Sequence, residues 1–521
     1  MTHRIPLSAV LVFALGQVYG ATNAAAVYLT PEAAARFLEQ ATWGPAPADV
    51  AHLQQVGFQA WLNEQFATAP GTLPAPDIAE KGIAVFQNAF FLNTIHGPDQ
   101  LRQRVAFALS EMWVVSAANE NSSAWITPYW ELLLNDAFGD YRGVMKDMTL
   151  DPGMGRYLNM VNNNKADSRT GTTPNENYAR ELMQLFTVGV NLLNPDGSIQ
   201  ADANGQPMPT YTQADVVSFS RALTGWTYPP KPHRTTPTSM GRHNPEYYVG
   251  TMAAVDANHD TDAKTLLNGA QLPAGQGAER DLDGVLDNLL NHPNTGPFVA
   301  KQLIQHLVSS NPSPGYVQRI ASVFADDGTG HRGNLQAVVQ AILLDPEARA
   351  GDDPAQAAAG GGHLREPLLF VTTIYRMLNS GVSSGYPGSH LPEALGQELF
   401  YEPSVFSYFS PQYRMPATGL PAPEFQIHSS ATAVAQANLA AALVAGTSDR
   451  RAQFEFAPYL AVAGSNDSLA AAINGAMLHG TMSAELKSAL DDVLNSGGDA
   501  PAKVKSAIAL VAASPEFAVE K

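Results

Sequence analysis

Cysteine is absent from the 521-residue chain. Without a thiol, the protein has no disulfide, no cysteine nucleophile, no cysteinyl zinc site, no iron–sulfur cluster and no c-type haem attachment. The fold must therefore depend on packing and non-covalent polar contacts. The absence of cysteine does not identify the compartment, because such a chain suits oxidising and reducing surroundings equally.

Charged residues are also scarce, at 15%, and acidic side chains outnumber basic ones by 48 to 30, which gives a formal net charge of −18. Nucleic acids and anionic membranes are bound by clustered lysine and arginine. We therefore expect no nucleic-acid partner for this acidic chain. Hydrophobic residues make up 45% of the chain, which is enough for a substantial core.

No apolar run approaches the roughly 18 residues of a membrane-spanning helix, but a shorter one lies near the start. Residues 3–4 are His and Arg, residues 5–14 are mainly apolar, and small residues follow up to Ala26. This order is typical of a secretory signal peptide. We expect residues 1–26 to be a signal peptide, cleaved between Gly20 and Ala26, and the protein to be periplasmic or secreted. A buried N-terminal helix is the alternative.

Hydrophobic residues recur with a period near 3.6 through most of the remaining chain, which predicts amphipathic helices. Alternating strand patterns are short, and the best lies at 244–252. The fold class is therefore all-α: a large multi-helix domain with long polar loops and one small β-hairpin. The segments with helical periodicity are 31–38, 49–66, 101–116, 130–148, 175–190, 213–224, 280–291, 295–309, 316–326, 333–344, 363–379, 430–446 and 501–512.

A glycine-rich stretch at 350–362 predicts a flexible linker. It divides the chain into a main helical domain, 27–354, and a C-terminal helical subdomain, 355–521, which we expect to pack on the first. Long surface loops are predicted where asparagine, proline, glycine and serine accumulate, at 191–212, 227–258 and 380–429.

Several common catalytic motifs are missing. The chain has no His-Glu-x-x-His, no phosphate-binding loop and no dinucleotide-binding glycine motif. Gly-x-Ser-x-Gly occurs at 381–385, but a helical pattern precedes it and Tyr-Pro-Gly-Ser follows. A nucleophilic serine in this motif needs a strand before it and a helix after it. The segment therefore predicts a turn, and neither a serine hydrolase nor a common zinc protease is indicated.

Polar residues are densest around the helix that begins near 175. Asn177 and Glu181 fall one turn apart beside the apolar stripe of this helix, where side chains are partly desolvated and need partners. Glu176 and Arg180 have the spacing of an ion pair, and Asn175 can cap the helix. Two interpretations remain open. Either Glu181 is catalytic and the other four residues bind a ligand, or the group holds the preceding Asn-rich loop.

A second cluster places His259, Asp260 and Lys264 close together among further aspartates. It is either a histidine–aspartate acid–base pair, a hard-cation site or a solvated loop that caps the next helix. We take His259 and Asp260 as candidate catalytic residues and Lys264 as a candidate binding residue. Arg102 and Arg104, at the start of a helix, suit bidentate binding of a carboxylate or sulfate. They equally suit ion pairs with nearby glutamates.

The segment PNENYARELMQLFTVG at 174–189 resembles the signature of a bacterial domain-of-unknown-function family, number 1800. The resemblance implies a mostly helical, exported bacterial protein with no settled activity. It also implies a partner, an exported alkaline-phosphatase-like or sulfatase-like protein encoded nearby. Further pieces that fit in chain order are FLEQATWGP at 37–45, RQRVAF at 102–107 with Glu111, YTQADV at 211–216, RALTGW at 221–226, HDTDAK at 259–264, HP at 292–293, FVAK at 298–301 and SPEF at 514–517.

Two functions are consistent with these observations. The first is a hydrolase that acts on extracellular or cell-envelope polymers such as glycans, with Glu181 or Glu176 and His259 as acid–base groups. Two carboxyls about 5–9 Å apart would be the arrangement of a glycosidase. The alternative is a non-catalytic glycan-binding or accessory protein for the partner hydrolase. Convergence of Glu181, Arg180, Asn177 and His259 in one cleft would favour the enzyme. The sequence indicates no particular metal or cofactor.

Overall fold

The computed structural model describes residues 29–76, 82–118, 122–356, 361–382, 391–448 and 452–521. Within these ranges the chain forms 21 α-helices and only six strands, each of two residues. The structure thus confirms the all-α class. The expected signal peptide, residues 1–26, lies outside the described residues.

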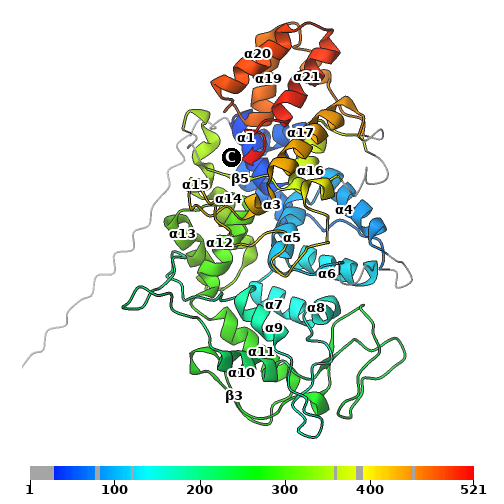
Figure 1. Cartoon of the computed structure of the whole chain (residues 1–521), viewed down its shortest axis with the longest axis vertical. Helices are drawn as coiled ribbons and strands as arrows, with labels where there is room; N and C mark the ends of the chain where they lie inside the picture. Colours follow the sequence, from blue (N-terminus) through cyan, green and yellow to red (C-terminus); the bar gives the residue numbers. More distant parts are fainter. Residues whose placement is uncertain (1–28, 77–81, 119–121, 357–360, 383–390, 449–451) are drawn as a thin grey trace, which may run out of the picture.

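The helices follow one another along the chain with few regular elements between them (Figure 1). The first ten are α1 (Pro31–Ala41), α2 (Pro47–Val56), α3 (Phe58–Ala67), α4 (Ala84–His96), α5 (Gln100–Met112), α6 (Ser123–Asp136), α7 (Tyr141–Leu150), α8 (Pro152–Tyr157), α9 (Asn177–Gln184) and α10 (Gln213–Ala222). The others are α11 (Ala278–Leu290), α12 (Thr295–Leu307), α13 (Pro314–Ala325), α14 (Leu335–Leu344), α15 (Pro346–Arg349), α16 (Pro367–Met377), α17 (Ser430–Ala445), α18 (Ala457–Leu460), α19 (Asn466–Leu478), α20 (Ala484–Asn495) and α21 (Ala500–Ala512).

The strands form three antiparallel pairs in the described part of the chain. The pairs are β1 (Trp226–Thr227) with β2 (Ala253–Ala254), β3 (Lys264–Thr265) with β4 (Gln271–Leu272), and β5 (His363–Leu364) with β6 (Val519–Glu520). Short 3-10 segments complete the regular structure: η1 (Asp256–Asn258), η2 (Leu267–Gly269), η3 (Ala350–Asp352), η4 (Pro354–Gln356), η5 (Glu393–Leu395) and η6 (Pro423–Ile427). The strand predicted at 244–252 is wrong, because β2 begins after it and the local hairpin is β3–β4.

Two segments predicted as single helices are broken. Gly57 has a φ of 78°, which ends α2 and lets α3 start at the next residue. The segment 130–148 is divided after α6, and Asp140 begins α7 by accepting a hydrogen bond from the backbone of Gly143 at 3.0 Å. In both cases the hydrophobic period continues across the break, so periodicity alone does not reveal it.

The segment predicted as one helix over 363–379 begins instead with strand β5, and helix α16 starts only at Pro367. A residue that precedes proline is disfavoured in helical backbone, whereas proline itself suits the first helical turn. Glu366 is therefore the extended N-cap residue of α16. The pairing of His363 with Glu520 brings this N-terminus beside the end of the chain.

Two hydrophobic clusters form the core. One contains buried residues from α1 to α14, and the other is built mainly from α16 and the helices that follow it. Figure 1 shows α19–α21 at one end of the molecule and α9–α11 near the other, with α5, α12 and α16 between them. Helix α16 contributes to both clusters. The division into 27–354 and 355–521 stays a prediction.

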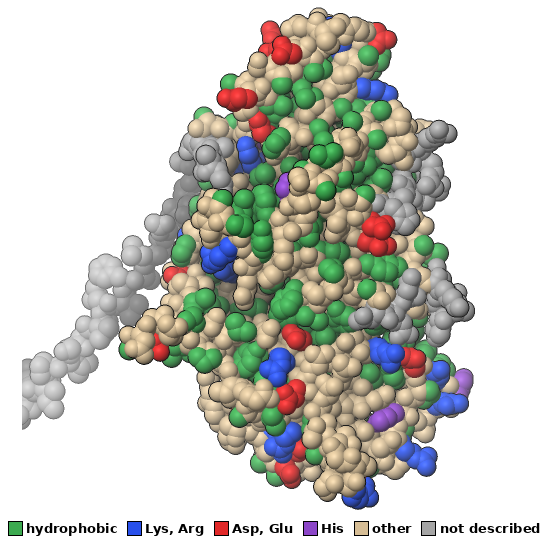
Figure 2. Space-filling model, in the orientation of Figure 1, with side chains coloured by type: hydrophobic (Ala, Val, Ile, Leu, Met, Phe, Trp, Pro, Cys, Tyr) green, Lys and Arg blue, Asp and Glu red, His purple; other side chains and the backbone are tan. Residues whose placement is uncertain are grey.

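The surface is mixed. Figure 2 shows hydrophobic side chains across the middle of one face, with lysine and arginine more frequent below them. No helix in the described ranges is long and apolar enough to cross a bilayer.

Candidate functional site

The residues predicted around α9 hold the preceding loop. The backbone N–H of Asn175 donates to Asn163 Oδ1 at 2.8 Å, and Asn163 Nδ2 donates back to the Asn175 carbonyl at 3.2 Å. Arg180 donates to Glu176 Oε2 at 3.1 Å, and Asn177 Nδ2 donates to Asn159 Oδ1 at 3.2 Å. The contacts of Asn175 and Asn177 reach the preceding loop, whereas Arg180 and Glu176 bond to each other within the motif.

Glu181 lies on the buried side of α9. Burial raises the pKa of its carboxyl, and the Oε2 atom has no hydrogen-bond partner among the described residues. No contact between described residues joins Glu181 to His259, and neither residue lines the cleft described below. The structure therefore does not bring Glu181 and His259 together, and their convergence was the observation that would have favoured a shared catalytic site.

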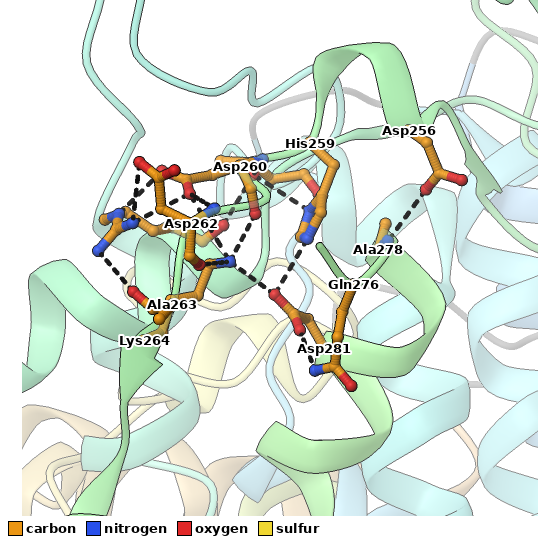
Figure 3. A network of polar contacts seen from close by, with 11 residues as sticks. Asp256, His259, Asp260, Asp262, Ala263, Lys264, Gln276, Ala278 and Asp281 are labelled. Carbon is orange, nitrogen blue, oxygen red and sulfur yellow. Dashed lines mark hydrogen bonds and ion pairs between the residues drawn. The ribbon is translucent and has the colours of Figure 1, made fainter. Parts of the chain in front are cut away.

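His259, Asp260 and Lys264 belong to a buried network around Asp281 of α11 (Figure 3). Lys264 Nζ donates to Asp281 Oδ2 at 2.7 Å, and His259 Nε2 lies 3.0 Å from the same oxygen. Asp260 accepts two hydrogen bonds from Arg221 of α10, at 2.8 and 3.0 Å. Burial acts to raise the pKa of Asp281, but the hydrogen bonds from His259 and Lys264 outweigh it and leave the pKa below its ordinary value.

The Lys264 ammonium occupies the place that a cation would take in this network. It donates to the backbone carbonyls of Asp260 and Asp262 as well as to the Asp281 carboxylate. Each carboxylate buried here thus faces a positive partner of the protein. These contacts join α10, α11 and β3 to one another. The network therefore has a structural role, and we call it the Asp281 clamp.

Arg102 and Arg104 also bind protein groups. Arg102 donates to the carbonyls of Thr68 and Leu134, and its guanidinium lies 4.6 Å from the ring centroid of Phe138. Arg104 is fully buried and donates to the backbone carbonyl of His306 at 2.5 Å. Arg104 therefore fixes the end of α12 against α5.

A different cluster of ionisable side chains lies where α5, α12 and α16 meet. Glu111 is in the last turn of α5, His306 is in the last turn of α12, and Glu366 is the N-cap residue of α16. His306 Nδ1 lies 3.0 Å from Glu111 Oε2, and the carboxyls of Glu111 and Glu366 are hydrogen-bonded to each other. One nitrogen or oxygen atom from each side chain lies within 4.8 Å of the other two. All three residues are at least nine-tenths buried.

Burial dominates the electrostatics of this cluster. It raises the pKa of Glu111 to about 7, and it raises the pKa of Glu366 still further because the neighbouring Glu111 carboxyl adds to the effect. Two adjacent buried carboxylates repel each other, so the pair shares a proton. Burial also lowers the pKa of His306 to about 4, which keeps the imidazole neutral. A third buried carboxyl nearby, Glu402, has a pKa raised by burial to about 8.

Uncharged groups orient the two carboxyls. Gln397 Nε2 donates to Glu366 Oε2 at 2.5 Å, and Gln397 is itself held by the backbone N–H of Leu368 at 2.9 Å. The Ser407 hydroxyl lies 3.5 Å from Glu111. The carboxyls therefore have fixed positions without a neutralising ion pair at close range.

Two further acid–base residues border the cluster, and each of them contacts another group of the protein. Glu424 accepts hydrogen bonds from the backbone N–H of Leu364 at 3.0 Å and from the Ser310 hydroxyl. His363 Nε2 lies 2.5 Å from a carboxylate oxygen of Glu520. We therefore place them around the cluster and not among its reactive groups.

The cluster lies beside a small cavity and a larger cleft. A small cavity of about 20 Å³ lies against Glu111, His306 and Glu366, and this volume suffices for one water molecule or one ion. Glu111 and Gln302 also line a neighbouring cleft of about 460 Å³. Other side chains of that cleft are Gln184, Leu193, Ile199, Phe298, Lys301, Gln305, Phe406 and Arg414. A buried acid–base group at the base of an open cleft is the usual setting of an active site.

Comparison with protein families matches residues 36–519 to DUF1800, described as a protein of unknown function. The chain belongs to the DUF1800 family. The match confirms the resemblance seen in the sequence and contains Glu111, His306 and Glu366. Comparison with curated proteins and with solved structures returned no match. Membership of DUF1800 therefore establishes the family, and the chemistry has to be argued from the site.

Sequence reasoning missed the three central residues of this DUF1800 protein. In the sequence Glu111 is part of the family pattern and a possible ion-pair partner for the arginines of its helix, whereas no motif there singles out His306 or Glu366. A usable signal was present: Glu111 follows the apolar run VAFALS, and Glu366 precedes PLLF. An ionisable residue inside an apolar helix pattern is buried and needs a partner or a function.

Proposed function

We propose that this DUF1800 protein is a hydrolase whose reaction centre consists of Glu111, Glu366 and His306. The observation that supports this most is the hydrogen-bonded carboxyl pair, which lines a small cavity and whose Glu111 also lines the larger cleft. Hydrolysis needs a base to take a proton from water and an acid to donate one to the departing group. A carboxyl pair that shares one proton supplies both. The neutral imidazole of His306, 3.0 Å from Glu111, holds that carboxyl in place.

The spacing of the carboxyls favours attack on an acyl group. In glycosidases the two carboxyls flank the sugar about 5–9 Å apart, whereas Glu111 and Glu366 are hydrogen-bonded to each other. In our proposal the ionised carboxyl accepts a proton from a water molecule in the small cavity. The water oxygen attacks the carbonyl carbon of an ester or amide, and the protonated carboxyl donates to the oxygen or nitrogen that leaves.

The cleft favours an acidic substrate. Lys301 and Arg414 both line it, and Lys301 has no ion pair or hydrogen bond among the described residues. Burial lowers the pKa of Lys301, and the adjacent charge of Arg414 lowers it further. An anionic group bound between them would relieve both effects. Phe298 and Phe406 offer apolar surfaces against which sugar rings pack. We therefore propose an acylated, acidic glycan as the substrate.

The compartment and partner belong to the same proposal. The pattern of residues 1–26 supports export to the periplasm or the medium, where such envelope polymers occur. The suggested partner is an exported phosphatase-like or sulfatase-like hydrolase that acts on the same polymer.

A substrate screen tests the proposed activity. Purified protein is incubated with acidic and neutral polysaccharides, each with and without ester or N-acyl groups, and released acid is measured. We expect release from acylated acidic members, reduced at least ~100-fold in Glu111→Gln because a base has been removed. Lys301→Met should raise KM for acidic members while kcat and the KM for neutral members stay unchanged. No release from any acylated member, or full activity in Glu111→Gln, would refute the proposal.

One observation favours non-catalytic glycan binding instead. A second cleft, of about 510 Å³, is lined by Asn159, Asn163, Asn175 and Tyr228, among other polar residues. Amide side chains and an aromatic ring are suited to sugar hydroxyls and sugar faces. Glycan affinity that is reduced by Tyr228→Ala, together with no acid release by the parent protein in the screen, would support this alternative.

A further inference from the structure

We infer that Glu111, His306 and Glu366 bind a divalent transition-metal ion, of which Zn²⁺ and Mn²⁺ are the best suited. The inference deepens the proposed function and rests on it for the role of the ion. Two carboxylates and one imidazole form a mixed oxygen–nitrogen donor set, which suits Zn²⁺, Mn²⁺ and Fe²⁺. Ca²⁺ is disfavoured because it takes six to eight oxygen ligands.

The geometry is close to that of a three-ligand site. Donor atoms at roughly 2.0–2.2 Å from one ion stand no more than about 4.4 Å apart. The donor atoms of Glu111, His306 and Glu366 lie within 4.8 Å of one another, a difference that small side-chain rotations remove. Each residue occupies the end of a helix, so the three side chains converge from separate elements. Three protein ligands leave positions open for water and substrate, which is the pattern of catalytic zinc sites.

An unsatisfied donor marks the same cavity. Gln302 Nε2 is buried and has no hydrogen-bond partner among the described residues, although its side chain lines the cavity with Glu111 and His306. Buried polar groups in proteins nearly always have a partner. A water molecule bound to an ion in this cavity would supply the missing acceptor. The space of about 20 Å³ is of the right size for that ion or water.

The surrounding contacts hold the ligands as a metal site requires. Gln397 donates to a carboxyl oxygen of Glu366, and Arg104 donates to the backbone carbonyl of His306 and so holds the end of α12 in place. Such outer contacts fix the orientation of ligands and raise metal affinity. The ion would take the place of the proton that the carboxyl pair shares, and its bound water would then supply both the attacking oxygen and the proton for the group that leaves. When bound, it lowers the pKa of its water and polarises an acyl oxygen.

Metal binding to the full chain tests the inference without any substrate. Chelator-treated protein is dialysed against Zn²⁺, Mn²⁺ or Ca²⁺, and bound metal is measured by mass spectrometry. We expect one Zn²⁺ or Mn²⁺ per chain, no equivalent Ca²⁺, and affinity at least tenfold weaker in Glu366→Gln and His306→Gln. His292→Gln is the matched control: burial lowers the pKa of His292 to about 4 as well, but its Nδ1 accepts from the backbone of Asn294. This variant should bind metal like the parent.

Two results would overturn the inference: no bound transition metal, or unchanged affinity in Glu366→Gln. If His306→Gln does not give the helical circular-dichroism spectrum of the parent, Glu366→Gln decides alone. The proposed function fails separately. If metal-free protein hydrolyses the substrate as fast as metal-loaded protein, the metal has no role in the reaction, and the proposed function of the carboxyl pair still stands. Bound metal without any hydrolysis would support the site and refute the activity.

Discussion

Replacing Asp281 with asparagine removes the carboxylate on which His259 and Lys264 converge. The Asp281 side chain is fully buried, and Lys264 is 2% exposed. In the variant the ammonium keeps its contacts with the carbonyls of Asp260 and Asp262 but loses its buried negative partner. Removing one member of a buried ion pair costs about 3–5 kcal/mol, because the other charge is left uncompensated. The two remaining carbonyl contacts place the expected loss near the lower end of that range.

The measurement is denaturant unfolding followed by circular dichroism. Asp262→Asn is the control, because its carboxylate is 90% exposed and 3.8 Å from Arg221, so the loss should stay below ~1 kcal/mol. Adding Lys264→Met to Asp281→Asn should recover part of the stability, since the unpaired charge is gone. If Asp281→Asn lowers the free energy of unfolding no more than Asp262→Asn does, the structural role of the Asp281 clamp is refuted. A normally stable Asp281→Asn protein that has lost its hydrolytic activity would refute it too.

Two other changes test separate parts of the structure. In chelator-treated protein, Glu111 and Glu402 have pKa values of about 7 and 8, so the folded state holds protons that the unfolded state releases above pH ~4.5. The contribution of these two carboxyls to stability should therefore be greatest below that pH and fall towards pH 8, by ~1.4 kcal/mol per unit of pKa difference. Glu402→Gln should flatten this slope, and a melting temperature that rises from pH 5 to pH 8 would contradict it. Gly225→Ala should destabilise the protein more than Gly57→Ala. Both glycines have a positive φ, which costs an alanine ~1–3 kcal/mol of strain. Only at Gly225 would the added Cβ also clash, because it would lie 2.8 Å from the Cβ of His259. Equal melting temperatures for the two variants would show this reasoning to be wrong.

Much of the helical fold was predictable because amphipathic periodicity reports burial directly. Helices such as α12 and α21 lie within a residue or two of their expected bounds. The places where helices end or give way to a strand were harder to predict from the sequence. The end of α2 depends on the positive φ of Gly57, and strand β5 depends on pairing with β6, which lies far away in the sequence. A local pattern contains neither kind of information.

The site was less predictable than the fold. The motif around Glu181 is conspicuous because its polar residues are adjacent in the sequence. In the structure these neighbours make local contacts with one another and with the preceding loop. Glu111, His306 and Glu366 lie far apart in the sequence and meet only through packing of α5, α12 and α16. A buried charge with no local partner was the available signal. Its partners required the tertiary structure.

The most direct test compares two isosteric variants on the first substrate that the screen identifies. Glu366→Gln alters the carboxyl pair beside the small cavity, whereas Glu181→Gln alters the carboxylate that sequence reasoning favoured. Our account predicts that kcat/KM falls at least ~100-fold in Glu366→Gln and stays within a few-fold of the parent in Glu181→Gln, with both proteins folded by circular dichroism. Full activity in Glu366→Gln together with a large loss in Glu181→Gln would contradict it.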